Sequence, residues 1–363
     1  MQIKKLHIQN FKSLVDFQLE DVPQFCAFVG PNASGKSNIF EALEFLNYLI
    51  RFDFDTASFF GGGDSLYSFS PIEINIKNKI YGQGFLLEMG DIKVSLNLSY
   101  KSDGSIGSLY SNNLLPSQDI TNRFSILQWN RNLEDKEIFI KKFKELGCNY
   151  NNEIELFFDN SSRVFVGKPE LRKINQSSNK LLIDASNTAQ ILGKIFQDEA
   201  KKEDFTEWLS ILIPEFKSID VVKSGIDGSF HIFVYEKSHS KPFPVTLLSD
   251  GTKNILALMA AVYQSNEPQF LCIEEPENGL HPHAIETLVD FFREKCETEG
   301  HHIWLNTHSP TLIRCLEIEE VITVNKINGE TKAKSFKKEE AFGMKMDEAW
   351  LTNALGGGVA WSK

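Results

Sequence analysis

The sequence lacks several features that would assign it to a simple class. It has no run of about 18 apolar residues, so no transmembrane helix is expected. Its first residues, Met-Gln-Ile-Lys-Lys-Leu-His-Ile, alternate like a β-strand and lack the apolar core of a signal peptide. The five cysteines are odd in number and form no CxxC motif, which argues against a disulfide framework. These absences predict a cytoplasmic protein that does not enter a membrane.

Basic charge is also in short supply. The chain has 38 Lys and Arg against 49 Asp and Glu, a net charge of −11. This balance argues against a mainly electrostatic nucleic-acid binder, although a local basic groove stays compatible with it. Internal repeats and sustained heptads are absent too, so no long coiled coil is expected. The 363 residues suffice for one large domain or two smaller ones.

A phosphate-binding pattern is the most informative feature that is present. Gly30-Pro-Asn-Ala-Ser-Gly-Lys-Ser37 fits G-x-x-x-x-G-K-[ST], with an apolar strand before it and a helical pattern after it. The glycines let backbone N–H groups and the helix N-terminus face an anion. Lys36 then reaches the β- and γ-phosphates of ATP, and the Ser37 hydroxyl sits on Mg²⁺. A glycine-rich turn with a chance lysine would not explain this flanking pattern. The predicted nucleotide-binding residues are Gly30, Pro31, Asn32, Ala33, Ser34, Gly35, Lys36, Ser37 and Asn38.

The segments on either side of this loop predict an α/β domain. Residues 25–29 are wholly apolar, as in a parallel strand that is buried on both faces. Over residues 36–50, apolar side chains recur at helical spacing and form one stripe. Cys26 and Cys272 lie in predicted core strands, where they are expected to act as small hydrophobic residues.

Two later strands end in polar residues suited to phosphate chemistry. Phe270-Leu-Cys-Ile-Glu274-Glu275 delivers two carboxylates to the carboxyl edge of the sheet. Glu274 is expected to hold Mg²⁺ directly or through water, and Glu275 to act as the general base for the attacking water. A strand at 303–307 ends at His308, which is suited to bind the γ-phosphate or that water. The alternatives are an acidic loop and a polar surface histidine.

A capped helix precedes these strands. Ser249 has N-cap chemistry, and Ile255, Leu256, Met259 and Val262 form an apolar helical stripe. One interpretation is an ordinary capped helix. The other is a signature sequence, in which the helix N-terminus and Ser249, Asp250 and Gly251 bind the γ-phosphate of an ATP held by a second subunit.

The order of these motifs resembles the ABC-type ATPases of the RecF, SMC and OLD group. Four segments carry most of the resemblance: Asn10-Phe-Lys-Ser13, Leu248-Ser-Asp-Gly-Thr252, Ile273-Glu-Glu-Pro-Glu-Asn-Gly-Leu-His-Pro282 and Thr307-His-Ser-Pro310. Asp184-Ala-Ser-Asn187, followed by Ile191-Leu192, resembles a further block placed before the signature. The resemblance covers about residues 1–50 and 180–315, and it implies an ATPase with Mg²⁺, a nucleotide-binding role for Lys12 and a head-to-tail homodimer closed by ATP. Asp250 replaces the first glycine of the transporter signature LSGGQ, which argues against a transporter subunit.

The resemblance implies an ABC-type P-loop NTPase of the α/β class. We expect a mixed or parallel core sheet, an N-terminal antiparallel β lobe and a helical/β insertion. Residues 1–100 form the first half of the ATPase domain and residues 181–320 the second half. Residues 101–180, with a helical stretch at 133–146, form an inserted lobe, and residues 321–363 form the C-terminal tail.

Local patterns add several smaller expectations. Hairpins are predicted at 85–100, with Gly90-Asp91 as the turn, and at 219–236, with Asp227-Gly228 in the turn. Residues 58–64 read as a glycine-rich connector, and 336–340 as a solvated charged segment. Residues 349–363 either pack on their own domain or form a docking peptide with exposed Trp350 and Trp361.

Two biological roles fit these features. One is an ATP-switched dimer that controls a separately encoded effector, such as a Toprim or HNH nuclease, in bacterial anti-phage defence. The chain is too short to hold a Toprim domain after the ATPase. The other role is a RecF-like repair or recombination ATPase that clamps DNA. The acidic balance favours the first role.

Overall fold

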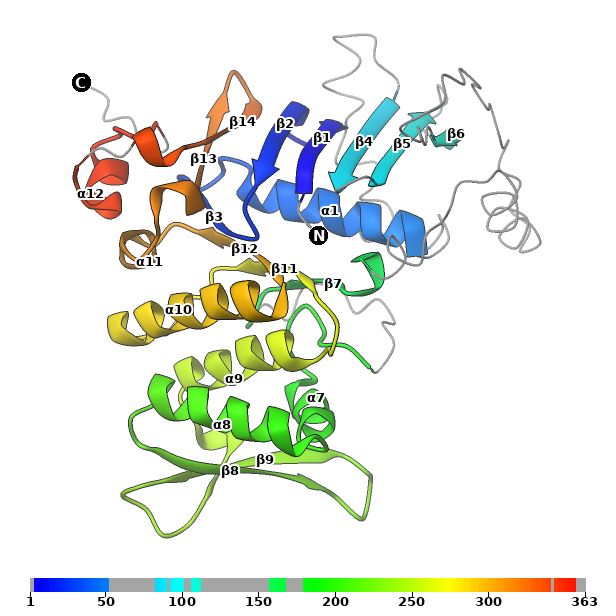
Figure 1. Ribbon diagram of the computed structural model, residues 1–363. Helices are drawn as coiled ribbons and strands as arrows, with labels where there is room; N and C mark the ends of the chain where they lie inside the picture. Colours follow the sequence, from blue (N-terminus) through cyan, green and yellow to red (C-terminus); the bar gives the residue numbers. More distant parts are fainter. Residues whose placement is uncertain are drawn as a thin grey trace. The chain divides into compact units, whose positions relative to one another are not determined.

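The computed structural model describes residues 3–51, 82–89, 92–100, 106–111, 157–167, 179–340 and 343–356. The chain divides into two compact units, and each is assembled from segments that are distant in sequence (Figure 1). The first unit takes Met1–Gln24, Gly30–Asp159 and Ile322–Lys337, and the second takes Phe25–Val29, Asn160–Val321 and Lys338–Lys363. The division into four consecutive segments that the sequence suggests stays a prediction.

The first unit contains a 5-stranded antiparallel sheet in the order β2-β1-β4-β5-β6. Its strands are β1 (Ile3–Phe11), β2 (Leu14–Val22), β4 (Gly82–Met89), β5 (Ile92–Tyr100) and β6 (Ile106–Ser111). The pairing of Met89 with Ile92 confirms the first predicted hairpin, whose turn at 90–91 lies outside the described residues. This sheet is the N-terminal antiparallel lobe that the resemblance implied.

A long helix and a further hairpin also belong to this unit. Helix α1 (Lys36–Arg51) lies against β1, where the rings of Phe11 and Phe45 are 5.7 Å apart between centroids. The antiparallel hairpin of β13 (Val321–Ile327) and β14 (Glu330–Ser335) brings β14 against β2. The apolar stripe of α1 predicted from the sequence is buried at Ile39, Leu43 and Leu46.

The second unit is built on parallel strands that pair in the order β3-β12-β11-β7. They are β3 (Phe25–Val29), β12 (His302–Thr307), β11 (Phe270–Glu274) and β7 (Ser161–Val164). Every residue of β3, β11 and β12 is buried, as the apolar sequence of β3 predicts for a strand covered on both faces, and in β12 this burial includes the polar His302, Asn306 and Thr307. Cys26 and Cys272 are buried in these strands, and burial raises the pKa of the Cys26 thiol well above its usual range.

Helices and a small sheet follow in layers (Figure 1). Helix α10 contacts β12, helices α8 and α9 contact each other, and α8 also rests on β8. The elements are α7 (Thr188–Ile195), α8 (Glu199–Leu212), β8 (Phe216–Lys223), β9 (Phe230–Glu236), β10 (Phe243–Pro244), the 3-10 turn η2 (Val245–Leu247), α9 (Asp250–Tyr263) and α10 (Pro282–Glu299). Strands β8 and β9 form the second predicted hairpin. The stripe expected on α9 is wider than predicted, because all its residues from Asn254 to Tyr263 are buried.

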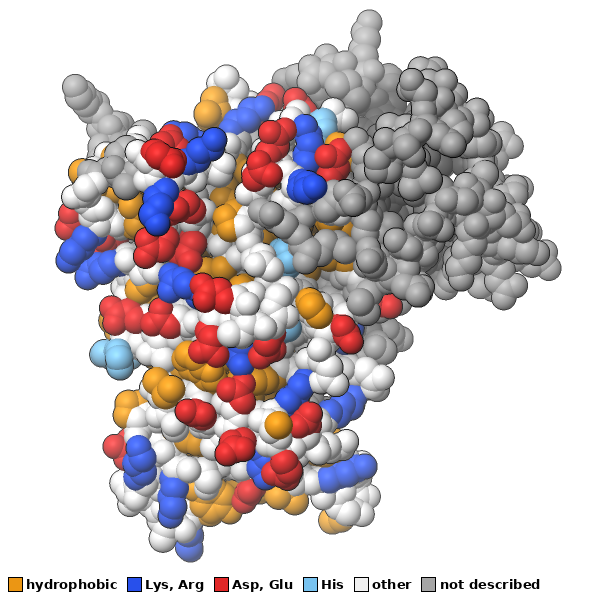
Figure 2. Space-filling view, viewed as in Figure 1, with side chains coloured by type: hydrophobic (Ala, Val, Ile, Leu, Met, Phe, Trp, Pro, Cys, Tyr) orange, Lys and Arg blue, Asp and Glu red, His pale blue; other side chains and the backbone are white. Residues whose placement is uncertain are grey.

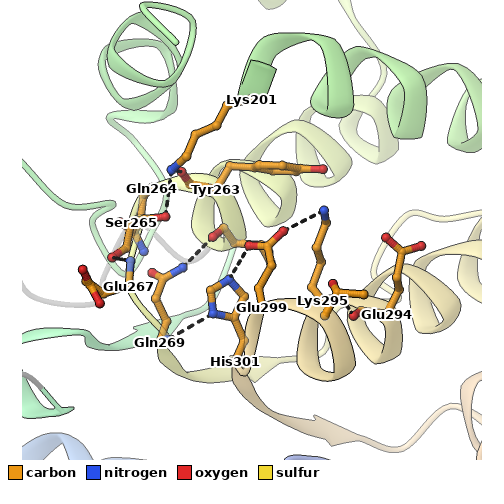
Figure 3. A network of polar contacts seen from close by, with 12 residues as sticks. Lys201, Tyr263, Gln264, Ser265, Glu267, Gln269, Glu294, Lys295, Glu299 and His301 are labelled. Atoms are coloured by element: carbon orange, nitrogen blue, oxygen red, sulfur yellow. Dashed lines mark hydrogen bonds and ion pairs between the residues drawn. The ribbon is translucent and has the colours of Figure 1, made fainter. Parts of the chain in front are cut away.

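A polar network holds helices α8, α9 and α10 together (Figure 3). The buried Lys295 ammonium of α10 lies 2.6 Å from Asp204 Oδ2 of α8 and 2.8 Å from Glu299 Oε1. His301 Nε2 lies 3.1 Å from the other oxygen of Glu299, and these two partners lower the pKa of Glu299 to about 2. Lys201 of α8 donates to the carbonyl oxygens of Tyr263 and Ser265 at the end of α9. These contacts give the buried Lys295 ammonium two carboxylate partners and link α10 to α8, and α8 to the end of α9.

The end of the chain corrects two expectations. Trp350 of α12 (Met346–Leu351) is only 7% exposed, since α12 packs on α11 (Pro310–Arg314) and Arg314 Nε donates to Asp347 at 2.7 Å. An exposed Trp350 on a docking peptide is therefore wrong, and Trp361 lies outside the described residues. Phe336 is likewise buried, whereas the 3-10 turn η4 (Lys338–Glu340) after it is exposed. The 3-10 turn η3 (Ile318–Glu320) leads into β13.

Several sequence expectations fall on residues that the structure does not describe. They are the glycine-rich connector at 58–64, the helical stretch at 133–146 and most of the inserted lobe at 101–180. Within the described ranges, no helix combines the length and apolar character needed to cross a bilayer.

Candidate nucleotide-binding and hydrolysis residues

The predicted phosphate loop adopts a tightly constrained backbone in the first unit. Ala33 and Gly35 have positive φ values of 64° and 101°. A Cβ atom at Gly35 would lie 1.9 Å from Thr331 Oγ1, so both the conformation and the space require glycine. The loop leads directly into α1, whose N-terminal amides and positive dipole end suit an anion.

Side chains from distant segments support this loop. Thr331 Oγ1 of β14 donates to the carbonyl oxygen of Ser34 at 2.9 Å and lies 2.6 Å from Ser13 Oγ. Asn38 Nδ2 donates to Ser13 Oγ at 2.7 Å. The side chains of Ser13, Asn38 and Thr331 therefore form one hydrogen-bonded group that supports the loop.

The two lysines of the predicted set lie in different surroundings. Lys36 is 7% exposed, and its ammonium donates to the carbonyl oxygens of Gly30 at 2.7 Å and Pro31 at 3.0 Å. The ammonium is thus held over the loop itself, where a phosphate would be its natural partner. Lys12 instead forms an ion pair with Glu41 of α1. A role in nucleotide binding therefore requires the Lys12 ammonium to contact a phosphate in addition to Glu41.

In the second unit, Glu274 stands at the end of β11 in a buried ion pair. Arg163 of the neighbouring strand β7 donates from Nε to Glu274 Oε1 at 2.7 Å and also from its Nη2 atom. Asn306 Nδ2 of β12 donates to Glu274 Oε2 at 3.2 Å. The side chains of Arg163 and Glu274 are 6% and 1% exposed, so the carboxylate is desolvated and held from both adjacent strands.

Glu275 turns away from the strand. Its φ is 47°, which is strained for a residue with a side chain, and its backbone N–H donates to the Asn306 carbonyl at 2.8 Å. Its carboxylate receives a hydrogen bond from Asn278 Nδ2 at 3.0 Å and lies 3.8 Å from His308 Nδ1. The structure therefore brings Glu275 and His308 together, with both side chains partly accessible, as a base and its neighbour require.

A second buried carboxylate organises the loop after Glu275. Glu277 Oε1 accepts a hydrogen bond from Thr307 Oγ1 at 2.5 Å, and Thr307 Oγ1 accepts one from the Ser309 N–H at 3.0 Å. Burial raises the pKa of Glu277. This arrangement ties the loop after β11 to the segment after β12, which carries His308.

The N-terminus of α9 matches its predicted cap. Ser249 Oγ accepts a hydrogen bond from the Thr252 N–H at 3.1 Å, and the Asp250 side chain is 96% exposed beside Lys253. The cap fits an ordinary helix start and a signature sequence equally well. Ser249 and Asp250 are exposed and Gly251 is half-buried, which is compatible with contact to a second subunit. The signature role stays a prediction.

The donor chemistry fits ATP and Mg²⁺. The Ser37 hydroxyl of the first unit is a hard oxygen donor of the kind that Mg²⁺ binds together with phosphates and waters. In the second unit the Glu274 carboxylate is a donor of the same kind, already paired with Arg163. Within the described residues, the buried Ser34 hydroxyl of the loop has no hydrogen-bond partner. When bound, Mg²⁺ supplies charge neutralisation at the phosphates.

Two relatives of known name are similar to this chain in sequence. A stretch of 90 residues is 29% identical to the DNA replication and repair protein RecF of Lactococcus lactis subsp. cremoris (strain MG1363), covering 22% of this chain and about a quarter (25%) of that protein. An ATP/GTP phosphatase of Helicobacter pylori (strain ATCC 700392 / 26695) is 21% identical over 369 residues, or 94% of each chain.

Solved structures share the fold. The SMC head bound to the C-winged helix domain of ScpA aligns with a TM-score of 0.56 and 16% identity, over 95% of this chain and 100% of that one. An SMC head with an extended coiled coil, from Pyrococcus furiosus, aligns with a TM-score of 0.50 and 14% identity, over 94% and 98% of the two chains. The fold and the motif set are those of an ABC-type ATPase of the RecF and SMC type. Residues 25–314 match one family model, and the chain belongs to that family, described as "AAA domain, putative AbiEii toxin, Type IV TA system".

Sequence reasoning missed three residues that hold the predicted ones. Thr331 lies 297 residues from Ser34, and Arg163 lies 111 residues from Glu274. Asn278 lies inside the segment 273–282 that carries the family resemblance, but the sequence alone assigns it no role. A strand of mixed polarity at 161–164 was the one local signal for Arg163, because a charged residue in a short buried strand needs a partner.

Proposed function

We propose that this protein is a Mg²⁺-dependent ATPase that works as a cytoplasmic, nucleotide-switched homodimer and controls a separately encoded effector. The observation that carries the hydrolytic part is the placement of Glu275, whose carboxylate is held by Asn278 and lies beside His308 without sharing the buried ion pair of Glu274. Glu275 is thus available as a base, whereas Glu274, the proposed metal ligand, is held by Arg163. The family match and the ATP/GTP phosphatase relative support this activity.

The residues take distinct parts in the proposed reaction. Lys36, Ser37 and the loop amides bind the phosphates, and Glu275 accepts a proton from the attacking water. The water oxygen bonds to the γ-phosphorus as the bond to the β–γ bridging oxygen breaks. His308 orients the water or stabilises the γ-phosphate, and Glu274 and Ser37 are the candidate metal ligands.

Lys36→Ala should weaken nucleotide binding by about 10- to 150-fold. Its ammonium already sits over the loop carbonyls, and a charge-assisted hydrogen bond is worth roughly 1.5–3 kcal/mol, or about 10- to 150-fold in affinity. Titration of a fluorescent ATP analogue tests this, with the exposed Lys4→Ala as the matched control. Equal affinities of the two variants would remove Lys36 from the phosphate site.

The dimer part of the proposal predicts a result for Ser249→Arg. In a Glu275→Gln background with saturating ATP, light scattering should report a dimer, because ATP would persist at the interface. Adding Ser249→Arg should leave a monomer that still binds ATP, since the bulky cation blocks the N-terminus of α9. The matched control is Ser210→Arg on an exposed position of α8, which should still dimerise. A monomer for Glu275→Gln itself would contradict the head-to-tail dimer.

The effector part rests on the family description, which includes a toxin of a Type IV TA system, and on the acidic balance of 49 against 38 charges. A nuclease of the Toprim or HNH class is the effector we propose, in bacterial defence. Copurification with the product of the adjacent gene tests this. The purified chain alone should hydrolyse ATP and leave DNA intact.

A second candidate, a RecF-like ATPase that clamps DNA, is favoured by one observation: the 90-residue match to RecF. On the face drawn in Figure 2, Lys and Arg side chains are interspersed with Asp and Glu and form no continuous basic patch among the described residues. Tight, salt-sensitive DNA binding that requires ATP and no partner would move the assignment to this second class.

A further inference from the structure

Asn254 joins the helix that begins at Ser249 to the loop that carries Glu275. It lies on α9, one turn beyond the N-terminus, and is 4% exposed. Its Nδ2 atom donates to the carbonyl oxygens of Pro276 at 3.0 Å and Asn278 at 2.8 Å. Both hydrogens of one side-chain amide are therefore used to hold two carbonyls of the same short loop.

A direct backbone contact reinforces this link. A Cβ atom at Gly251 would lie 2.4 Å from the carbonyl oxygen of Gly279, and Gly279 has a φ of 74°. Only glycine at 251 allows the first turn of α9 and the loop to approach this closely. Asn254 and Gly251 are thus two attachments, one turn apart on α9, to the loop at 275–280.

The loop passes this attachment on to Glu275. Asn278, whose carbonyl is held by Asn254, donates its own side-chain amide to Glu275 Oε2 at 3.0 Å. The Asn278 N–H also donates to the Glu275 carbonyl oxygen at 3.1 Å, which closes the turn. A shift of Asn278 of a few tenths of an ångström would move the carboxylate of Glu275, whose strained backbone needs support from its surroundings.

We propose that Asn254 is a positioning residue for hydrolysis, which fixes the Glu275 carboxylate to the N-terminus of α9 through Asn278. The inference rests on the proposed function, because it assigns to Asn254 an effect on the base of that reaction. In this role Asn254 does not itself contact the reacting groups. It acts through the loop at 275–280, so that a movement of Ser249 at the start of α9 is accompanied by a movement of Glu275.

Asn254→Asp tests the link, because aspartate keeps the shape of asparagine and loses both donors. The turnover number should fall at least about tenfold, since an ångström of misplacement at a reacting group can lower a rate about a hundredfold. KM for ATP and the nucleotide affinity should stay within about twofold, because no atom of the phosphate loop is altered. Asn254→Ala, which removes the amide without adding a charge, should lower the turnover number to a similar extent, and it serves if the aspartate variant does not fold.

The matched control is Gln269→Glu. Gln269 is also a buried amide, 3% exposed, that donates to a carbonyl of α9, that of Val262, but it lies at the far end of the helix (Figure 3). Its loss should lower the melting temperature as Asn254→Asp does and leave the turnover number within about twofold. If both variants lowered turnover alike, Asn254 would be a stability residue only.

A double-mutant cycle gives the decisive readout. In a Glu275→Gln background, single-turnover hydrolysis should change less than about twofold on adding Asn254→Asp, because the group that Asn254 positions is gone. An equal fold-loss in both backgrounds would overturn the proposal. Wild-type turnover is measured first. Its absence would contradict the proposed function, and the positioning role would fall with it. A hydrolysing wild type with an additive cycle would contradict only Asn254.

Discussion

Glu275→Gln should lower ATP turnover by roughly 10²- to 10⁴-fold, the usual contribution of a general base, while ATP still binds. The reason is geometric as well as chemical. Glutamine keeps an oxygen that can accept the 3.0 Å hydrogen bond from Asn278, so the loop keeps its shape, but the amide cannot take a proton from water. Phosphate release and nucleotide titration, measured on the same preparation, separate the two effects.

A matched acid-to-amide change sharpens this test. Glu286 on α10 has a side chain that is 57% exposed, and Glu286→Gln should leave turnover unchanged. Near-normal turnover in Glu275→Gln would show that Glu275 is not the base, and it would turn attention to other acceptors around the strand ends. A loss of nucleotide affinity in Glu275→Gln would instead show that this carboxylate serves binding.

The parts of the fold that the sequence predicted are those fixed by local pattern. β3 begins and ends where its apolar run does, and β11 extends its apolar run by one residue, Glu274, because both faces of a buried parallel strand are largely apolar. The cap at Ser249 is equally local, since its acceptor and donor are three residues apart. The fold class inferred from these motifs is confirmed by the likeness to an SMC head.

The parts that could not be predicted depend on partners far along the chain. Nothing near Thr331 marks it as the support of the phosphate loop, because its partner Ser34 is 297 residues away. Asn254 looks like any polar position in a helix until α9 is seen to be buried on all sides from residue 254 onward. Trp350 was misjudged for a related reason. Fraying at a chain end is a local expectation, and the packing of α12 on α11 overrides it.

Removing Arg163 should destabilise the protein more than removing Arg163 and its partner together. Arg163→Met leaves the Glu274 carboxylate buried without its cation, and breaking a buried pair in this way costs about 3–5 kcal/mol of unfolding free energy. Arg163→Met with Glu274→Gln buries no unpaired charge, so most of the loss should be recovered. Urea unfolding of the nucleotide-free protein measures both.

The unfolding free energy that Glu274→Gln restores to Arg163→Met shows how strongly the Glu274 charge depends on Arg163. An exposed pair in the same unit, Lys202 with Glu199 at 3.9 Å, should lose at most about 1 kcal/mol on Lys202→Met, because water replaces the lost partner. If Arg163→Met behaved like Lys202→Met, water or another cation would already reach Glu274, and its charge would not depend on Arg163. A large loss with strong recovery would mean that Glu274 always needs a cation beside it. The protein would then supply one itself from β7, and any metal that binds Glu274 would add to or displace this guanidinium rather than meet a bare carboxylate.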